Sequence, residues 1–158
     1  NAMKAPLSNM GALFKLAGDR LASRFKNPTV PVKNKQLEPY AKELSSRVKE
    51  FGSAVEAALV RHQKKILDKE YIQERLADAA IEIFNSASVL SRLDSELSNN
   101  APDVSKNLPI GTYYLKTANR RIKANLVAMG DNDDEAATAA ANIVLDQYKP
   151  ALTNGKHA

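Results

Sequence analysis

The sequence contains no cysteine and no tryptophan among its 158 residues. Without cysteine the chain has neither a disulfide scaffold nor a thiolate metal site, which suits a reducing compartment. Long apolar runs are also missing: no stretch approaches the roughly 20 apolar residues that a membrane-spanning helix needs. No secretory signal is visible, because Gly11 and Lys15 interrupt the apolar residues near the N-terminus. We therefore expect a protein that is soluble or bound to a membrane surface.

Acidic residues are scarce at the N-terminus. Residues 1–37 carry seven basic side chains and one acidic side chain, Asp19, whereas residues 38–158 carry sixteen basic and seventeen acidic side chains. The net charge of +5 therefore comes entirely from the N-terminal segment. We interpret the remainder as an ordinary solvated domain and the N-terminal segment as a separate basic element.

Hydrophobic residues in the remainder recur at spacings of three and four, which is typical of helices that bury one face. Four segments carry this pattern, through Leu44, Val48, Phe51, Val55, Ala58, His62 and Ile66, then Ile72, Leu76, Ala79, Ile83, Leu90 and Leu97, then Leu115, Ala118, Ile122, Leu126 and Met129, then Ala140, Ile143 and Val144. Four amphipathic helices with short connections predict an all-α fold, an antiparallel four-helix bundle. Its core is expected to contain Phe51, Val55, Leu76, Ile83, Leu90 and Ile122.

Residues that favour helix ends predict the boundaries of these helices. Pro39 suits the first turn of the first helix, and Asp68 is a candidate N-cap for the second. The third helix is expected to stop at Gly130 and the fourth at Pro150.

Candidate catalytic and metal-binding residues are few. His62 on an apolar helix face is either a ligand or a partly buried structural histidine, and we favour the second interpretation. No Glu-x-x-His pair is present for a carboxylate-bridged di-iron site. Asp131-Asn132-Asp133 begins like a calcium loop, but Ala136 stands where the loop needs glycine, so helix capping explains these acids better. We therefore predict no catalytic, cofactor-binding or metal site in this chain.

The order of motifs resembles a known family. A linker, KNPTVPVKN, precedes the stretch FGSAVEAALVRHQKKILDKEYIQERLADAAIEIFNSASVLSRLDSEL, which is similar to the C-terminal domain of very-long-chain acyl-CoA dehydrogenases and their near relatives. The opening NMGALFKLAGDRL resembles the segment that joins the catalytic core to this domain in that family. The resemblance covers roughly residues 5–98 and fades over the third and fourth helices.

The resemblance implies that the chain is one part of a larger enzyme. Such enzymes are FAD-dependent flavoproteins that introduce a double bond into a fatty acyl-CoA, and their catalytic glutamate and flavin site lie in a preceding core. The chain alone is then no enzyme and binds no cofactor, whereas the parent enzyme uses FAD in fatty acid β-oxidation. The implied partners are the enzyme's own catalytic core, a homodimer mate and a membrane. The implied location is the cytoplasm or a membrane surface in bacteria, and the matrix side of the mitochondrial inner membrane in eukaryotes.

The N-terminal segment has the pattern of an amphipathic helix. At 100° per residue its apolar side chains share one face, and two arginines border that face; the residues concerned are Met10, Leu13, Phe14, Ala17, Arg20, Leu21, Arg24 and Phe25. This arrangement is typical of a helix that lies in an anionic membrane surface, with the arginines snorkelling. The alternative is that the same face docks on protein, either this bundle or the catalytic core. Nucleic acid is disfavoured because aromatic residues do not alternate with the basic ones.

The predicted organisation combines these elements. Residues 1–3 are a cloning remnant with the start methionine, residues 4–27 the basic amphipathic segment, 28–37 a linker, 38–149 the four-helix bundle and 150–158 a tail. Two functions remain open: an accessory domain of a long- or very-long-chain acyl-CoA dehydrogenase that supports core and dimer packing and membrane association, or a free-standing helical bundle that binds protein partners or lipid without catalysis.

Overall fold

The computed structural model describes residues 28–154, with side chains described for residues 28–148. This part of the chain forms four α-helices, α2 (Glu38–His62), α3 (Glu70–Ser98), α4 (Val104–Ala128) and α5 (Asp134–Asn154), and two short 3-10 helices, η1 (Lys35–Leu37) and η2 (Gln63–Asp68). The residues described include no strand, so the predicted all-α fold is confirmed.

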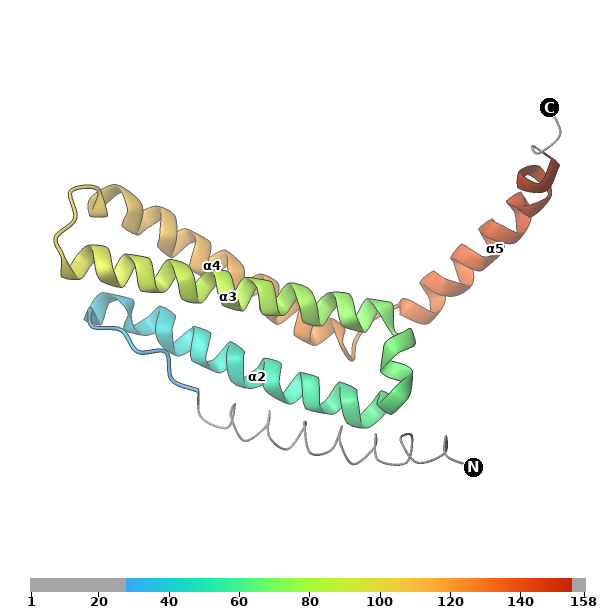
Figure 1. The fold of residues 1–158 in the computed structure, drawn as a ribbon, viewed down its shortest axis with the longest axis horizontal. Coiled ribbons are helices and arrows are strands. Elements are labelled where there is room, and N and C mark those ends of the chain that lie inside the picture. The colour runs from blue at the N-terminus through green and yellow to red at the C-terminus, as the bar shows by residue number, and fades with distance from the viewer. Residues whose placement is uncertain (1–27, 155–158) are drawn as a thin grey trace, which may run out of the picture.

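Helices α2, α3 and α4 lie side by side with alternating direction, and α3 packs most extensively against α4 (Figure 1). These three helices are called the bundle below. The predicted helical bundle is therefore confirmed, but α5 does not lie along the other three helices. It leaves the end of α4 and projects away from the bundle (Figure 1).

The core of the bundle consists of two clusters of buried apolar residues. The larger one joins η1 and the first half of α2 to α3 and α4, through Leu37, Ala41, Leu44, Leu90, Leu93 and Leu115. The smaller one, Ala58, Ile66 and Ile72, lies at the end of the bundle where η2 links α2 to α3.

Of the predicted core residues, Leu90 and Ile122 are each only 1% exposed. The other four, Phe51, Val55, Leu76 and Ile83, lie on the predicted helix faces but are half-buried. Three packed helices enclose each apolar face less completely than four would, which accounts for this difference.

A glycine allows α3 and α4 to approach closely. A Cβ atom added at Gly111 would lie 2.7 Å from Cδ1 of Leu93, well inside van der Waals contact. A side chain at residue 111 would therefore require the side chain of Leu93, a member of the larger core cluster, to move. Pro109 also lies inside α4. The helix therefore begins before Pro109 and Gly111, the two residues that disfavour a helix near its start.

The turn between α2 and α3 differs from the predicted capping. Asp68 belongs to η2 and is not the N-cap of α3; that position is Lys69, whose side chain makes no capping hydrogen bond. Instead Gln73 closes the turn, because its side-chain amide donates to the carbonyl oxygens of Ile66 at 2.8 Å and Leu67 at 3.0 Å. These hydrogen bonds satisfy carbonyl groups at the end of η2 and tie α3 to the turn; they do not replace an N-cap, which would accept from the free N–H groups of α3.

The predicted helix ends are confirmed in part. Pro39 lies in the first turn of α2, as predicted, and Gly130 directly follows Met129, the C-cap of α4. The prediction that the last helix stops at Pro150 is wrong, since α5 continues to Asn154. Proline fixes φ at a value that a helix can use, so it disfavours a helix, through a lost hydrogen bond and a crowded carbonyl four residues earlier, without excluding one.

Candidate functional site

The residues predicted to contact membrane or protein lie outside the described part of the chain, so their role stays a prediction. They are Met10, Leu13, Phe14, Ala17, Arg20, Leu21, Arg24 and Phe25. The structure does describe residues 28–34, the part of the predicted linker that precedes η1, and these residues are called the linker below.

This linker is attached to the bundle at several points. Val30 and Val32 pack against the larger core cluster, and the backbone N–H of Val30 donates to Oγ of Ser45 at 3.1 Å. Asp94 on α3 accepts hydrogen bonds from the backbone N–H groups of Lys33 at 3.0 Å and Asn34 at 2.9 Å. The chain therefore enters the bundle at a fixed position.

The side chain of Asn34 completes this attachment. Its amide donates to Oδ1 of Asp94 at 2.8 Å, to the backbone carbonyl of Asp94 at 3.0 Å and to Oγ of Ser98 at 3.0 Å. The hydrogen bonds that reach the carboxylate stabilise its ionised form. The N–H of Lys33, and then the side-chain amide of Asn34, therefore lower the pKa of Asp94 below its ordinary value.

Asp94→Asn is expected to lower the free energy of unfolding at pH 7 by about 1–3 kcal/mol, because it removes the charge that strengthens these hydrogen bonds. The folded-state pKa of Asp94 lies below its unfolded value of about 3.9, so its contribution is complete above that value and is lost as pH falls through the folded pKa. Urea unfolding of variant and parent at pH 7, 5 and 3 measures the difference, which should shrink towards pH 3. Asp78→Asn, at an exposed position of the same helix, is the matched control; an equal effect of both substitutions would contradict this role for Asp94.

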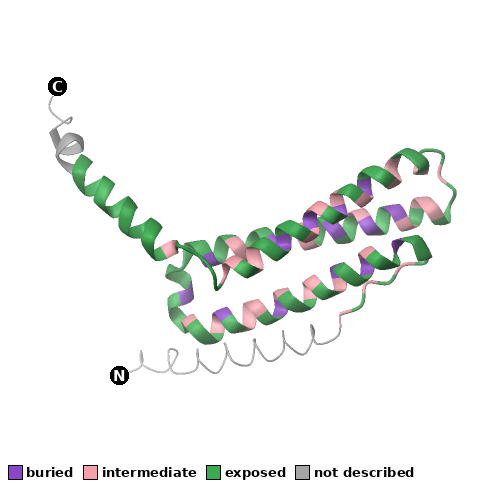
Figure 2. Ribbon diagram, turned by 180° about the vertical axis from the view of Figure 1, so that it is seen from behind, coloured by how far each residue is buried: buried purple, intermediate pink, exposed green. Residues whose placement is uncertain are grey.

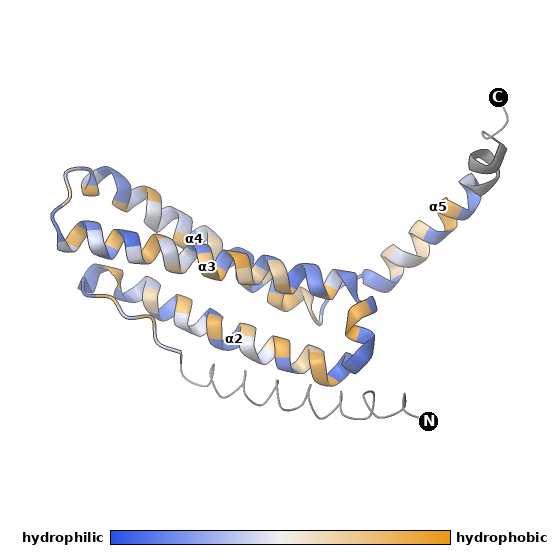
Figure 3. Ribbon diagram, in the orientation of Figure 1, coloured by the Kyte–Doolittle hydropathy of each residue, from blue (hydrophilic) through white to orange (hydrophobic). Residues whose placement is uncertain are grey.

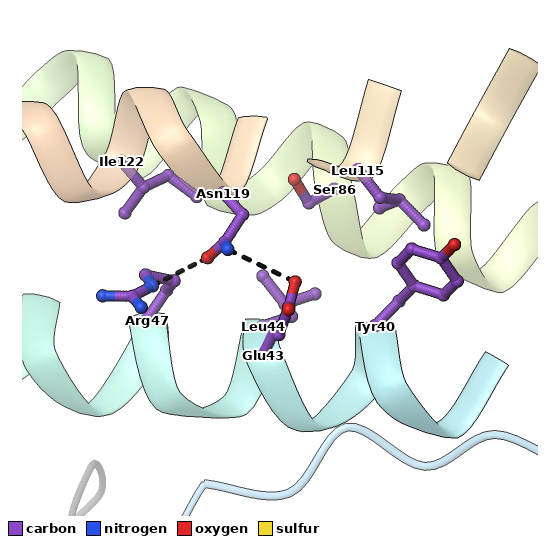
Figure 4. Close-up of a pocket in the computed structure, with 8 residues that line it drawn as sticks. All are labelled: Tyr40, Glu43, Leu44, Arg47, Ser86, Leu115, Asn119 and Ile122. Atoms are coloured by element: carbon purple, nitrogen blue, oxygen red, sulfur yellow. Dashed lines mark hydrogen bonds between the residues drawn. The ribbon is translucent and has the colours of Figure 1, made fainter. Parts of the chain in front are cut away.

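A polar layer crosses the middle of the bundle. The guanidinium Nε of Arg47 donates to Oδ1 of Asn119 at 2.7 Å, and the amide of Asn119 donates to Glu43 at 3.2 Å (Figure 4). A cavity of about 10 Å³ adjoins these residues and is also lined by Ser86, a volume that fits one water molecule. In the described part of the chain the buried hydroxyl of Ser86 has no hydrogen-bond partner. This layer joins α2 to α4 and offers no room for a substrate.

Glu82 forms the centre of a second polar cluster, between α3 and α4. Its carboxylate accepts a hydrogen bond from the hydroxyl of Tyr114 at 2.8 Å and forms an ion pair with Arg121 at 2.8 Å. Burial alone would raise the pKa of Glu82, but the hydrogen bonds from Arg121 and Tyr114 outweigh it and lower that pKa. Glu82 is therefore held ionised, which suits a structural ion pair and not a general base tuned to neutral pH.

The start of α5 is joined to α3 by one bidentate ion pair. Both terminal nitrogens of Arg75 donate to Asp134, at 2.7 and 2.6 Å. The acids of this segment were predicted to favour the positive end of a helix, and Asp134 and Glu135 do lie in the first turn of α5. Pairing with Arg75 was not predicted. The hydrogen bond from Arg75 lowers the pKa of Asp134, so this carboxylate is ionised at neutral pH.

An open cleft of about 860 Å³ lies between α5 and the corner formed by α2, η2 and α3. Arg61, His62, Lys69 and Tyr71 contribute to its bundle side. His62 is half-buried, as predicted, and it lines this cleft. Within residues 28–148, no three His, Cys, Asp or Glu side chains gather where they could hold a metal ion. The described helices also include none long and apolar enough to cross a membrane.

Comparisons with known proteins agree on one family. A family model described as "ACAD9/ACADV, C-terminal domain" matches residues 35–148, which include all of α4 and most of α5, where the resemblance in sequence motifs fades. The chain is 29% identical over 133 residues to the very long-chain specific acyl-CoA dehydrogenase, mitochondrial, of Bos taurus, covering 82% of this chain and 20% of that protein. It is 27% identical over 139 residues to the protein of the same name from Rattus norvegicus, covering 85% and 21%. The human protein of that name is 29% identical over 133 residues, covering 82% and 20%.

Proposed function

Because this chain belongs to the family of ACAD9/ACADV C-terminal domains, we propose that it is the accessory helical domain of an FAD-dependent long- or very-long-chain acyl-CoA dehydrogenase. The observation that carries the proposal is the family match over residues 35–148, which spans the whole bundle. The chain spans about one fifth of the length of the relatives it matches. The flavin site and the catalytic residues of the parent enzyme then belong to its core and not to this domain.

The polar contacts of the described residues hold the helices of this domain in place, which suits an accessory domain. The polar clusters around Asn119 and Glu82 and the ion pair of Arg75 with Asp134 each join two helices. Their members are paired with one another, as expected for side chains that fix the positions of helices. We propose that the domain packs against the catalytic core of its own enzyme and contributes to its homodimer.

The second part of the proposal concerns membrane association. Residues 9–26 are proposed to lie in an anionic membrane surface, with Leu21 at the centre of the apolar face and Arg20 and Arg24 at its border. The linker supports this role, because Asp94 and Asn34 hold the point where the segment joins the bundle. The parent enzyme would then lie on the cytoplasmic membrane surface in a bacterium, or on the matrix side of the inner membrane in a mitochondrion.

The purified chain is expected to be colourless and to leave palmitoyl-CoA unoxidised, since the proposal assigns the flavin site and the catalytic glutamate to the core. Absorbance in the visible flavin bands and a dye-reduction assay with added FAD measure these two properties. A stoichiometric flavin spectrum or measurable dehydrogenation would contradict the assignment. Retention of the separately expressed core of the parent enzyme by the immobilised chain is the positive arm of the same experiment.

A further inference from the structure

Ser86 is a polar residue in the apolar interior of the bundle. It lies on α3 and is 3% exposed, on the same side of the helix as the buried residues Ala79 and Leu90. Buried residues occur along most of α3 (Figure 2). Among the residues whose side chains the structure describes, Ser86 is the only buried one that is polar. A buried hydroxyl normally has a hydrogen-bond partner, because leaving it without one costs free energy.

The hydroxyl of Ser86 differs from other hydroxyls in the helices. Four of these donate to the carbonyl oxygen four residues earlier in their own helix, at 2.7 to 3.0 Å: Ser45, Ser88, Thr112 and Thr138. Ser86 makes no such bond, and its Oγ has no partner among the described residues. Both its proton and its lone pairs are therefore available to a ligand in the cavity that it lines.

This cavity has polar groups from three helices in its walls. Helix α3 contributes the hydroxyl of Ser86, α4 the amide of Asn119, and α2 the side chains of Arg47 and Glu43 (Figure 4). The volume of about 10 Å³ admits one water molecule and nothing larger. Buried waters in proteins typically make two to four hydrogen bonds to polar groups of this kind.

The side chain of Asn119 has hydrogen-bonding capacity left over. Its Oδ1 accepts from Nε of Arg47 at 2.7 Å, and a carbonyl oxygen can accept a second hydrogen bond. Its nitrogen donates to Glu43 at 3.2 Å and carries a second proton. A water molecule beside Asn119 can therefore donate to its oxygen or accept from its nitrogen, and can use its other positions for Ser86.

We propose that this cavity binds one water molecule, which bridges the hydroxyl of Ser86 to the side-chain amide of Asn119. The hydrogen bonds of the polar layer join α2 to α4. The water adds α3, so that one polar layer connects all three helices of the bundle. This site concerns the fold of the domain alone and does not depend on the proposed function.

The bridge also specifies how far α3 is shifted along the other two helices. Hydropathy changes sharply along α3 (Figure 3), and the residues one turn away from Ser86 are Glu82 and Leu90. A shift of α3 by one turn would bring one of these to the polar layer. Leu90 has no polar group to offer, and the carboxylate of Glu82 is paired with Arg121. Only the observed register places a hydroxyl beside the cavity.

The effect of Ser86→Ala on stability tests the bridge by its sign. If the hydroxyl is hydrogen-bonded to a water molecule, its removal raises the equilibrium constant for unfolding, roughly fivefold for one net hydrogen bond. If the hydroxyl is buried without a partner, its removal lowers that constant, because a costly polar group disappears and no hydrogen bond is lost. Urea unfolding of the full chain measures the constant.

Ser88→Ala is the matched control for this comparison. Ser88 is exposed on the same helix, and its hydroxyl is bonded to the carbonyl of Phe84. Both substitutions gain the stronger helix preference of alanine, so the ratio of the two unfolding constants isolates the buried hydroxyl. The constant of Ser86→Ala is expected to be roughly fivefold larger than that of Ser88→Ala.

Oxygen-17 relaxation dispersion of the solvent counts long-lived bound water directly. The signal comes from the water oxygen, so exchange of the serine proton does not affect it. Ser86→Val fills the cavity with methyl groups and is expected to lower the number of long-lived waters by one. Ser88→Val makes the same change at an exposed position and is expected to leave that number unchanged.

Two results would overturn the proposal. One is an unfolding constant for Ser86→Ala equal to or smaller than that of Ser88→Ala, which would show that the hydroxyl has no bound partner. The other is the same number of long-lived waters in the parent chain and in Ser86→Val. If Ser86→Val does not fold, the alanine comparison still decides, because alanine fits the space that serine occupies.

Discussion

Leu90→Ala is expected to lower the free energy of unfolding by about 2–5 kcal/mol, the range for removing a large aliphatic side chain from a packed core. Leu90 is 1% exposed and belongs to the larger core cluster, where α3 meets both α2 and α4. The loss has two parts: the transfer of the removed carbon atoms, and the contacts forfeited around the cavity that remains. Guanidinium unfolding followed by far-UV circular dichroism measures it.

Two further alanine substitutions on α3 make this experiment a test of the buried face. Ile83 is half-buried against the same cluster, so Ile83→Ala should cost less than Leu90→Ala. Ile81 is 57% exposed on the outer side of the helix, and Ile81→Ala should change stability by less than about 1 kcal/mol. Equal losses at residues 81 and 90 would show that the structure assigns the wrong face of α3 to the core.

Hydrophobic periodicity correctly predicted which face of α2, α3 and α4 is buried, because that face depends on the spacing of residues within one helix. Leu90 and Ile122 are buried because they lie on the apolar side of their helices. Phe51 and Val55 lie on the equivalent side of α2 and are only half-buried. The degree of burial depends on how many neighbouring helices surround a position, and the spacing of residues within one helix contains no information about that number.

The same limit applies to α5. The helical spacing of Ala140, Ile143 and Val144 predicted a helix with a face to bury, and the helix is present. Whether that face packs within the chain or outside it depends on the direction in which α5 leaves α4. The contacts described at its start are the hydrogen bond from Asn132 to the carbonyl of Ala128 and the ion pair of Asp134 with Arg75, which is 59 residues away in the sequence.

The contacts at the linker could not be predicted for a related reason. Asp94 and Asn34 are 60 residues apart, and each is an ordinary polar residue in its own segment. The motifs that led to the correct family are mostly packing residues of α2 and α3, which identify a domain without indicating which polar side chains hold its ends together. Only the folded arrangement brings the carboxylate of Asp94 to the N–H groups of Lys33 and Asn34.

The chain is expected to sediment with liposomes that contain anionic lipid, and Leu21→Glu is expected to abolish this binding. The substitution places a charge at the centre of the proposed apolar face of residues 9–26. Each large apolar side chain that enters the membrane surface contributes less than the roughly 1.5–3 kcal/mol of full burial, and each nearby basic residue adds about 1 kcal/mol. Added salt should weaken binding, because charges are screened over roughly 8–10 Å at physiological ionic strength.

A second variant separates the apolar from the electrostatic contribution. The double substitution Arg20→Ala and Arg24→Ala keeps the apolar face and removes two lipid-facing charges, so it should weaken binding by about 2 kcal/mol at most. Melting of the same proteins distinguishes lipid from protein as the partner of this segment. If residues 9–26 bind lipid, Leu21→Glu leaves the melting temperature unchanged, because the bundle begins at Glu38. If they dock on the bundle instead, Leu21→Glu lowers the melting temperature and the parent chain does not bind liposomes, a result that would exclude the membrane proposal.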